Sequence, residues 1–208
     1  GAEGGEEEKG SGGGGGGGCN SGGGCGKEEH NLKIYYTNAN GLFNKLDELK
    51  IFLSLNHSNI DIICVTETHF SKDILDAEAH IDGYTFFRHD RDFKVNDSLR
   101  NDVSHGGGSI IYVKNYINVS REVALANAPD SLAVMIDTAV GNLCIACIYR
   151  SNSLSLIQNS NLISCLKSIC NIDNDYETIL VGDFNLPDVS WETGCVNGGV
   201  IGNNKAFL

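Results

Sequence analysis

The chain has 208 residues, 41% of them hydrophobic, and a formal net charge of −12. This length allows one domain with its own core and little more. The acidic balance argues against a protein that coats DNA through a basic face. It does not exclude a nuclease, because a metal ion can supply positive charge at the phosphate. No run of about eighteen apolar residues occurs, so the sequence predicts no transmembrane helix.

Residues 1–30 are rich in glycine and glutamate and contain almost no apolar side chains. A segment of this composition cannot bury enough surface to offset its chain entropy, so we expect it to be disordered. The composition changes sharply at Asn31. The sequence therefore predicts one folded domain over residues 31–208.

The remaining sequence alternates between strand-like and helix-like patterns. Continuous apolar runs predict strands, and apolar residues at helical spacing predict helices. In chain order we expect a strand at 32–36, a helix at 46–57 with Asn44 as its N-cap, strands at 60–65 and 84–88, a surface loop at 89–105, strands at 109–113, 132–137 and 143–149, a helix at 156–170, and a strand at 178–181. Strand–helix–strand units at each end, with hairpins between them, predict an α/β sandwich of sheets covered by helices.

Eight cysteines occur at irregular spacings, and most of them lie in apolar segments, where a free thiol acts as a small hydrophobic side chain. Cys144 and Cys147 have the spacing of half a zinc or redox site, but no second pair and no His stands close in the sequence. We therefore favour a structural role for these two thiols. The pattern suggests a reducing, intracellular location, nuclear or cytoplasmic.

Four polar clusters stand at the ends of predicted strands. They read NANG from Asn38, TET from Thr66, YRSN from Tyr149 and GDFN from Gly182. In α/β sheets, binding sites lie where the strand ends converge. A carboxylate held at a strand end suits Mg²⁺, which takes oxygen ligands in strict geometry. Asn and Asp also favour turns, and a turn explains each cluster well when it is taken alone. Glu67 is the exception, because Glu is not a turn former.

Taken together and in order, the clusters resemble the motifs of the endonuclease/exonuclease/phosphatase superfamily, the DNase I-like enzymes. The stretch LKIYYTNANGL is similar to the family's opening strand and Asn motif, and DIICVTET is similar to the strand that carries the metal-binding Glu. ILVGDFN is the most specific match, to an apolar strand followed by the GDxN motif. NANGLFNKLDEL, ETHF and GDFNLPDVSWE are most similar to endonuclease domains of non-LTR retrotransposons, and the resemblance covers about residues 32–208.

The resemblance implies a four-layer α/β sandwich, in which helices flank two packed, mixed β-sheets. It also implies metal-dependent hydrolysis of phosphodiesters, with Mg²⁺ or Mn²⁺ as cofactor and DNA as substrate, and a reverse transcriptase downstream in the full-length protein. Carried over by position, Glu67 would bind the metal ion. Asn38 would help to position the ion and the attacked phosphate, and Asn40 lies nearby.

The later motifs carry the remaining roles that the resemblance implies. Tyr149 would donate a hydrogen bond to the phosphate, and Asn152 matches a secondary polar position near it. Asp183 would orient or deprotonate the attacking water. Asn185 would hold the phosphate.

The sequence departs from the family pattern in two respects. Ser151 stands where related sequences often have Pro, and the late-strand Asp and the terminal Ser-Asp-His motif have no counterpart before Leu208. We therefore expect a fold without its C-terminal strands and an impaired hydrolase. Each His is expected to be a surface or loop residue, and none is assigned to the hydrolysis. The alternatives are a non-catalytic remnant that binds a metal or a partner, and a phosphatase or phospholipid phosphodiesterase of the same superfamily.

Overall fold

The computed structural model describes residues 31–55, 59–91, 106–125, 128, 130–138, 141–171, 175–193 and 195–196. The disorder expected for residues 1–30 and most of the loop expected at 89–105 lie outside this part of the chain. All the elements below belong to the unit Leu32–Leu208. No helix in the described part combines the length and the apolar character that crossing a membrane requires.

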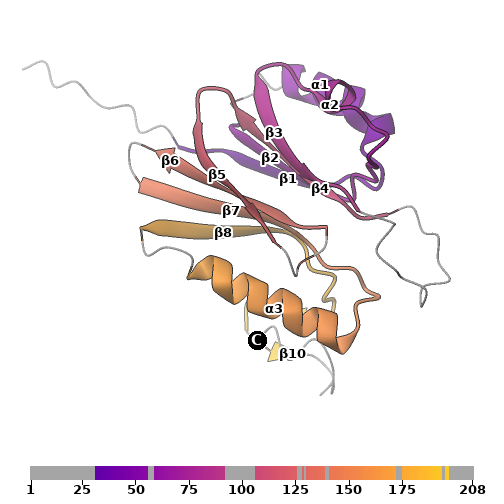
Figure 1. Ribbon diagram of the computed structural model, residues 1–208, viewed down its shortest axis with the longest axis vertical. Coiled ribbons are helices and arrows are strands. Elements are labelled where there is room, and N and C mark those ends of the chain that lie inside the picture. Colours follow the sequence, from indigo (N-terminus) through magenta and orange to yellow (C-terminus); the bar gives the residue numbers. More distant parts are fainter. Residues whose placement is uncertain are drawn as a thin grey trace, which may run out of the picture. The chain divides into compact units, whose positions relative to one another are not determined.

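The first half of the domain forms a mixed four-stranded sheet, shown in indigo to magenta in Figure 1. Its strands are β1 (Ile34–Asn38), β2 (Ile62–Thr66), β3 (Tyr84–His89) and β4 (Ser109–Lys114), in the order β1-β2-β4-β3. β1 and β2 are parallel, and β4 runs antiparallel to both of its neighbours. All five side chains of β2 are buried, as expected for a central strand that is covered on both faces.

The parallel pair β1 and β2 is connected through a 3₁₀ turn, η1 (Phe43–Lys45), and the helix α1 (Leu46–Leu55). Asn44 lies inside η1, so the prediction that it caps α1 was wrong, because the 3₁₀ turn runs directly into the helix. A short helix, α2 (Asp76–Ala79), follows β2. Neither η1 nor α2 was predicted, since each is too short to show a helical period.

The second half forms another mixed four-stranded sheet. Its strands are β5 (Asn118–Ala124), β6 (Leu132–Thr138), β7 (Gly141–Tyr149) and β8 (Tyr176–Asp183), in the order β5-β6-β7-β8. The first three strands are antiparallel, and β7 and β8 are parallel across the helix α3 (Leu156–Cys170). α3 begins with a capping box, in which Ser155 and Gln158 each accept a hydrogen bond from the other's backbone nitrogen. A small antiparallel pair, β9 (Val189–Ser190) and β10 (Cys195–Val196), follows β8.

The two sheets pack face to face around one apolar core. The buried members of this core come from β2 and β4 in one sheet and from β6 and β7 in the other: Ile62, Cys64, Ile111, Val113, Leu132, Val134, Ile136, Ile145 and Cys147. The outer face of the first sheet is covered by α1 and α2, and the outer face of the second by α3 (Figure 1). This helix–sheet–sheet–helix order confirms the expected α/β sandwich of two packed, mixed sheets flanked by helices.

Cys144 and Cys147 lie on opposite faces of β7. Cys144 is in the core under α3, and Cys147 is in the core between the sheets. Both are free thiols, and the Cys147 thiol donates to the Val65 carbonyl oxygen at 3.7 Å. Because residues three apart in a strand face opposite ways, the pair cannot share a metal ion. The position of the two thiols therefore fits the structural role that we favoured.

Candidate active site

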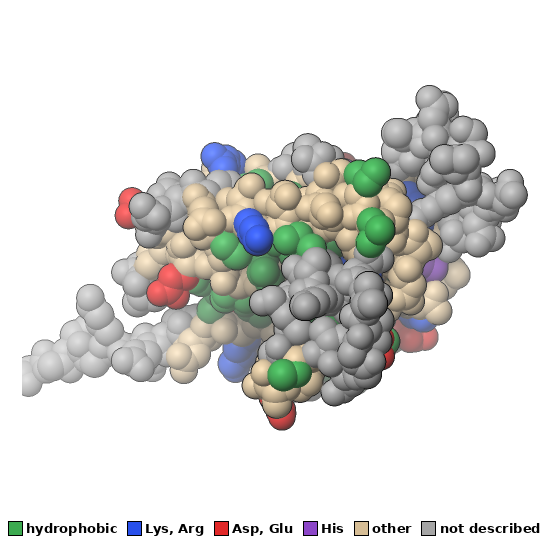
Figure 2. Space-filling view, turned by 90° about the horizontal axis from the view of Figure 1, so that it is seen from below, with side chains coloured by type: hydrophobic (Ala, Val, Ile, Leu, Met, Phe, Trp, Pro, Cys, Tyr) green, Lys and Arg blue, Asp and Glu red, His purple; other side chains and the backbone are tan. Residues whose placement is uncertain are grey.

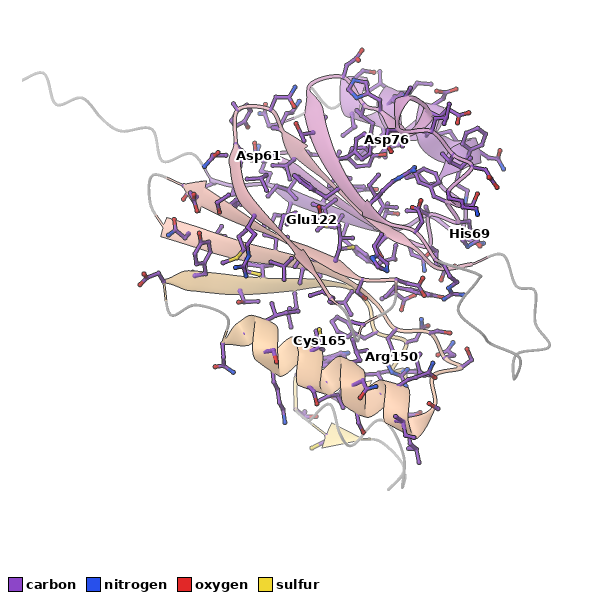
Figure 3. All side chains as sticks on the ribbon, viewed as in Figure 1. Asp61, His69, Asp76, Glu122, Arg150 and Cys165 are labelled. Atoms are coloured by element: carbon purple, nitrogen blue, oxygen red, sulfur yellow. The ribbon has the colours of Figure 1, made fainter. Side chains whose placement is uncertain are left out.

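Four strand ends define the candidate site. The parallel register of β1 and β2 pairs Asn38 with Thr66, and that of β7 and β8 pairs Tyr149 with Asp183. Within each sheet, the two carboxyl ends therefore lie together. In Figure 3, His69 and Arg150, which follow strands of different sheets, lie at one end of the sandwich, and Asp61 lies at the other.

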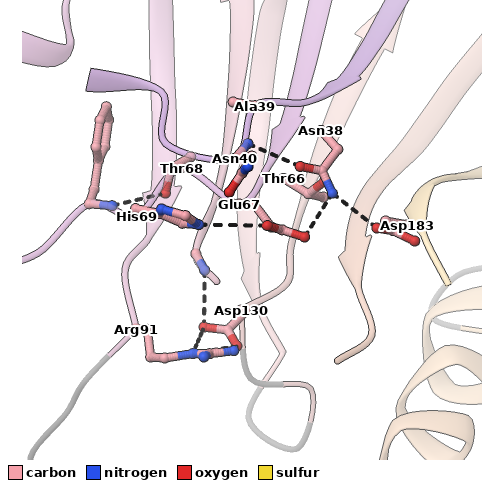
Figure 4. Close-up of polar contacts among 12 residues, drawn as sticks. Asn38, Ala39, Asn40, Thr66, Glu67, Thr68, His69, Arg91, Asp130 and Asp183 are labelled. Carbon is pink, nitrogen blue, oxygen red and sulfur yellow. Dashed lines mark hydrogen bonds and ion pairs between the residues drawn. The ribbon is translucent and has the colours of Figure 1, made fainter. Parts of the chain in front are cut away.

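The Asn38 side chain joins the two halves of the site (Figure 4). Its amide nitrogen donates to Glu67 Oε1 at 2.8 Å and to Asp183 Oδ2 at 3.0 Å. The two carboxylate oxygens therefore lie no farther apart than the sum of these two distances. Asn38 Oδ1 accepts from the backbone nitrogen of Asn40 at 3.0 Å, which fixes the orientation of the amide group. Asn40 thus contributes through its backbone, and its side chain is exposed.

The loop that carries Glu67 is held between two other loops. Backbone nitrogens of Gly41 and Leu42 donate to the carbonyl oxygens of Glu67 and Thr68 at 2.8 and 2.9 Å. On the other side, His69 donates to Gly107, and Thr68 donates to Gly108. Gly108 has a φ of +79°, and a Cβ there would stand 2.6 Å from the Thr68 hydroxyl oxygen, so only glycine fits this contact.

The backbone of this region is strained. Every non-glycine residue of the described part with a positive φ lies in or next to the cluster: Asn40, Glu67, His69, Asp130 and Asn185. Asn, Asp and His visit this conformation more readily than Glu, for which it is uncommon. Strained residues persist where the surroundings hold them, and they concentrate at functional sites. The strained backbone and the polar motifs therefore indicate the same functional site.

Asp183 is fixed at both of its carboxylate oxygens. Oδ2 accepts from Asn38, and Oδ1 accepts from the backbone nitrogen of Asn185 at 3.0 Å. The Asn185 side-chain nitrogen donates to the Arg150 carbonyl oxygen at 2.9 Å. Asn185 therefore braces the end of β8 against the residue that follows β7, and its expected phosphate contact stays a prediction.

Arg150 is a buried residue that the sequence analysis did not single out. Its guanidinium donates to Asn159 Oδ1 at 3.0 Å and to the carbonyl oxygens of Phe184 and Asn185 at 3.3 and 3.0 Å. Burial lowers its pKa. The guanidinium thus ties α3 to the GDFN loop. The sequence signal was present, since an Arg directly after a buried strand needs partners, but the partners depend on the fold.

Tyr149 points its hydroxyl group into an acidic environment. Burial raises its pKa to about 12, and the charge of Glu67 and a hydrogen bond with Glu67 act in the same direction. Arg91 opposes this shift, and Asp183 adds to it. The hydroxyl group therefore stays protonated at neutral pH and can donate a hydrogen bond. Tyr36 behaves similarly: burial is the main cause that raises its pKa to about 12, and its hydroxyl group contacts the Thr66 hydroxyl at 3.0 Å.

Arg91 supplies a positive charge near these groups. It forms a bidentate pair with the buried Asp130, in which Nε donates to Oδ1 at 3.1 Å and Nη2 donates to Oδ2 at 2.5 Å (Figure 4). Burial lowers the Arg91 pKa, but the hydrogen bonds and charge of Asp130, with Tyr149 and Glu67, outweigh it, so the pKa is raised. Neither residue was assigned to the site from the sequence, because the two lie far apart in the chain and outside the motifs.

The histidine beside Glu67 also differs from its expected setting. His69 is a loop residue, as predicted, but only 22% of its side chain is exposed, and its Nε2 lies 3.6 Å from Glu67 Oε2.

Asn152, in contrast, is exposed in the turn before α3, and in the part of the chain that the structure describes it makes no hydrogen bond to the cluster. Its secondary role stays a prediction.

The donor atoms at this site fit a hard cation that keeps much of its water. Among the described residues, no group of three or more His, Cys, Asp and Glu side chains is placed to hold a metal ion. Mg²⁺ typically binds through one or two carboxylates and retains several waters. Glu67, oriented by Asn38, offers such a carboxylate, and the described residues offer no all-protein cage.

On the face that Figure 2 shows, the described residues form no broad basic surface. Seen from the side of α3, the Lys and Arg side chains of the described residues are scattered singly over this face. This agrees with the formal net charge of −12. Two basic side chains lie beside the motif residues: Arg91, which pairs with Asp130, and Lys45, which donates to the Ala39 carbonyl oxygen.

Comparisons with known proteins support the fold. No family model matches the sequence, and no curated protein sequence matches it. The AP endonuclease LMAP from Leishmania major matches in structure with a TM-score of 0.58 at 18% identity, over 85% of this chain and 64% of that chain. The catalytic domain of Xenopus laevis APE2 matches with a TM-score of 0.55 at 17% identity, over 74% of this chain and 58% of that chain.

TDP2 from D. rerio, solved with a single-strand DNA product, matches with a TM-score of 0.54 at 17% identity, over 76% of this chain and 62% of that chain. At such identities the likeness shows the fold alone, which is the α/β fold of DNase I-like proteins. The chain spans less than two thirds of the length of each of these three structures.

Proposed function

We propose that this chain is a divalent-metal-dependent phosphodiesterase that hydrolyses DNA. The observation that carries the proposal is the Asn38 amide, which donates to a carboxylate of each sheet, at 2.8 and 3.0 Å. A structural turn would not require two carboxylates from different sheets to gather around one amide. Like charges at this spacing are costly unless a cation or a proton offsets them.

The proposal gives each residue a role that its surroundings allow. Glu67, oriented by Asn38, would hold Mg²⁺ or Mn²⁺, which supplies a Lewis acid for the phosphate when it is bound. Tyr149, whose raised pKa keeps it protonated, would donate to the phosphate. Asp183 would orient the attacking water and accept its proton.

Asn185, Asn40 and Asn152 would act at the edge of the site in this proposal. Asn185 would donate one hydrogen of its side-chain amide to the phosphate while the other stays on the Arg150 carbonyl oxygen. Asn40 would keep the Asn38 amide in place through its backbone nitrogen. Asn152 would contact the substrate beyond the phosphate.

A groove beside Asn38 favours DNA over a lipid or inositol phosphate as the substrate. It encloses about 350 Å³ and is lined by Tyr35, Phe52, Lys45 and Glu48, among others. The ring centroids of Tyr35 and Phe52 are 5.1 Å apart. Aromatic faces combined with a basic side chain are the usual means of binding unpaired nucleotides.

The finer type of the enzyme rests on the sequence resemblance. We propose an endonuclease of the non-LTR retrotransposon type, whose full-length protein carries a reverse transcriptase. We also propose that this chain hydrolyses slowly, because its described residues provide no histidine–aspartate pair beside Asp183. General acid–base groups contribute about 10²- to 10⁴-fold each.

The test is nicking of supercoiled plasmid DNA with Mg²⁺ or Mn²⁺, at enzyme concentrations high enough to detect a slow rate. Glu67→Gln and Asp183→Asn should each lower the rate by about 10²-fold or more. The matched control is Asp82→Asn, which changes a carboxylate whose side chain is fully exposed in another loop.

Three results would count against the proposal. The first is a wild-type rate that does not depend on the cation. The second is an equal fall in the nicking rate of the Asp82→Asn and Asp183→Asn variants. The third is cleavage of sphingomyelin vesicles or inositol phosphates, but not of plasmid, which would transfer the site to the alternative phosphodiesterase function.

A further inference from the structure

His69 presents a nitrogen atom without a hydrogen-bond partner to the carboxylate of Glu67 (Figure 4). Its Nε2 is buried, and among the described residues it has no hydrogen-bond partner. Glu67 Oε2 lies 3.6 Å from it, which is beyond the range of a normal N–H···O bond. A buried polar atom without a partner costs free energy, so its presence calls for an explanation.

The spacing of the two atoms matches two ligands of one cation. A ligand atom lies about 2.1 Å from Zn²⁺ or Mg²⁺. Two such atoms at an angle of about 90–110° are therefore about 3.0–3.5 Å apart. The observed 3.6 Å is close to this range. It is too long for a direct hydrogen bond and too short to seat a separate water molecule between the atoms.

The backbone holds the ring in this position. His69 has a φ of +55°, and its backbone nitrogen donates to the Gly107 carbonyl oxygen at 3.0 Å. Glycines stand on two sides of the imidazole: a Cβ at Gly41 would lie 3.5 Å from Nδ1, and a Cβ at Gly106 would lie 3.9 Å from Nε2. Both distances are ordinary van der Waals contacts, so the two loops enclose the ring closely.

We propose that His69 Nε2 is a second protein ligand of the divalent ion bound at Glu67. This inference rests on the proposed function, because Glu67 must hold the ion. Two protein ligands with water completing the coordination agree with the absence, among the described residues, of a group of three such side chains. An imidazole ligand favours transition ions such as Zn²⁺ over Mg²⁺, so His69 would set the metal preference of the site.

The competing explanation is a protonated His69 that pairs with Glu67 by charge alone. That arrangement would repel a cation, and no metal-bound nitrogen would be seen. A second explanation is that the ring only fills space in the loop. Both explanations predict that replacing His69 leaves metal affinity unchanged or raises it.

The test uses Mn²⁺ as a paramagnetic probe and isothermal titration with Zn²⁺ and Mg²⁺. Pulsed EPR of wild-type protein with Mn²⁺ should show coupling to a histidine nitrogen, and the lines should change when histidine is labelled with ¹⁵N. His69→Gln should remove the coupling and weaken Zn²⁺ binding by about tenfold or more, with a smaller effect on Mg²⁺. The control is His80→Gln, because His80 Nε2 also lies beside a carboxylate, at 3.3 Å from Asp82, but is half exposed.

The outcomes separate the two proposals. Binding of Mn²⁺ that depends on Glu67 but shows no histidine nitrogen would overturn the role of His69 and leave the proposed function intact. Absence of any binding that depends on Glu67 would overturn both. If His69→Gln does not fold, the labelled spectrum of a variant whose other five histidines are replaced by Gln decides.

Discussion

At the scale of single residues, the candidate site is a set of polar groups that share one network. Asn38 has no free donor hydrogen left, because both of them go to carboxylates. Replacement of Asn38 by Asp would add a negative charge and remove both donors. The neutral amide therefore suits this position better than the acid of the same shape.

The tyrosines of the site give a pH dependence with a definite sign. Tyr149 and Tyr36 have their pKa values raised to about 12, mainly by burial, whereas an unfolded tyrosine ionises near 10. Between these pH values the unfolded chain has lost the protons that the folded chain still holds. The free energy of unfolding should therefore be fully retained below about pH 10 and should fall as the pH rises toward 12.

The measurement is urea denaturation at several alkaline pH values. Tyr149→Phe should make the free energy of unfolding fall less steeply with pH, because it removes one of the hydroxyl groups whose pKa is raised in the folded chain. Tyr116→Phe is a weak control, since Tyr116 also has a raised pKa. Tyr35→Phe is the better one, because it changes a ring in the neighbouring groove. An unchanged slope in Tyr149→Phe would contradict the assignment.

At the scale of elements, two strand–helix–strand units place the site. Each unit aligns two parallel strands, so each sheet brings two polar strand ends together. The close approach of β7 and β8 depends on Gly182, which has a φ of +149°. A Cβ at this position would collide with the backbone carbonyl group of Ile148.

Substitution at Gly182 tests that close approach. Gly182→Ala should lower the free energy of unfolding by more than about 1 kcal/mol, because backbone atoms cannot move aside as a side chain can. Gly141→Ala is the matched control: its φ is +156°, but a Cβ there would meet nothing within 4 Å. Thermal or urea denaturation of the two variants should separate them, and equal losses would refute the collision.

The sequence predicted the elements that have strong periodic patterns. The strand–helix–strand units, the buried strand β2 and the helix α3 were all expected, and the boundaries moved by a few residues, as for β1, which ends at Asn38. The strand β5 was missed because it is polar, NVSREVA, and lies at the edge of its sheet with a register shift between Val119 and Arg121. Edge strands have one free side and need little apolar character.

The site was predictable only in part, for a physical reason. The motif residues follow strands, and strand ends could be read from the apolar runs that precede them. His69, Arg91 and Asp130 were not assigned to the site, because their roles depend on contacts across loops and between sheets. The Arg91–Asp130 pair joins residues that are 39 positions apart.

At the scale of the whole domain, each sheet supplies half of the candidate site. Asn38 and Glu67 come from the first sheet, whereas Tyr149 and Asp183 come from the second. The halves meet only while the apolar core between the sheets is intact. Any loss of that packing should therefore remove hydrolysis before either half of the domain is unfolded.

The most direct test of the central claim is a double-mutant cycle of Glu67→Gln and Asp183→Asn, measured as the rate of metal-dependent plasmid nicking. When two residues act as one unit, the rate losses caused by replacing each of them are not additive in the double variant. The account predicts that each single variant falls by about 10²-fold or more and that the double variant is hardly slower than the worse single one. Losses that multiply in the double variant, or single variants as fast as the wild type, would contradict the claim that the two carboxylates form one active site.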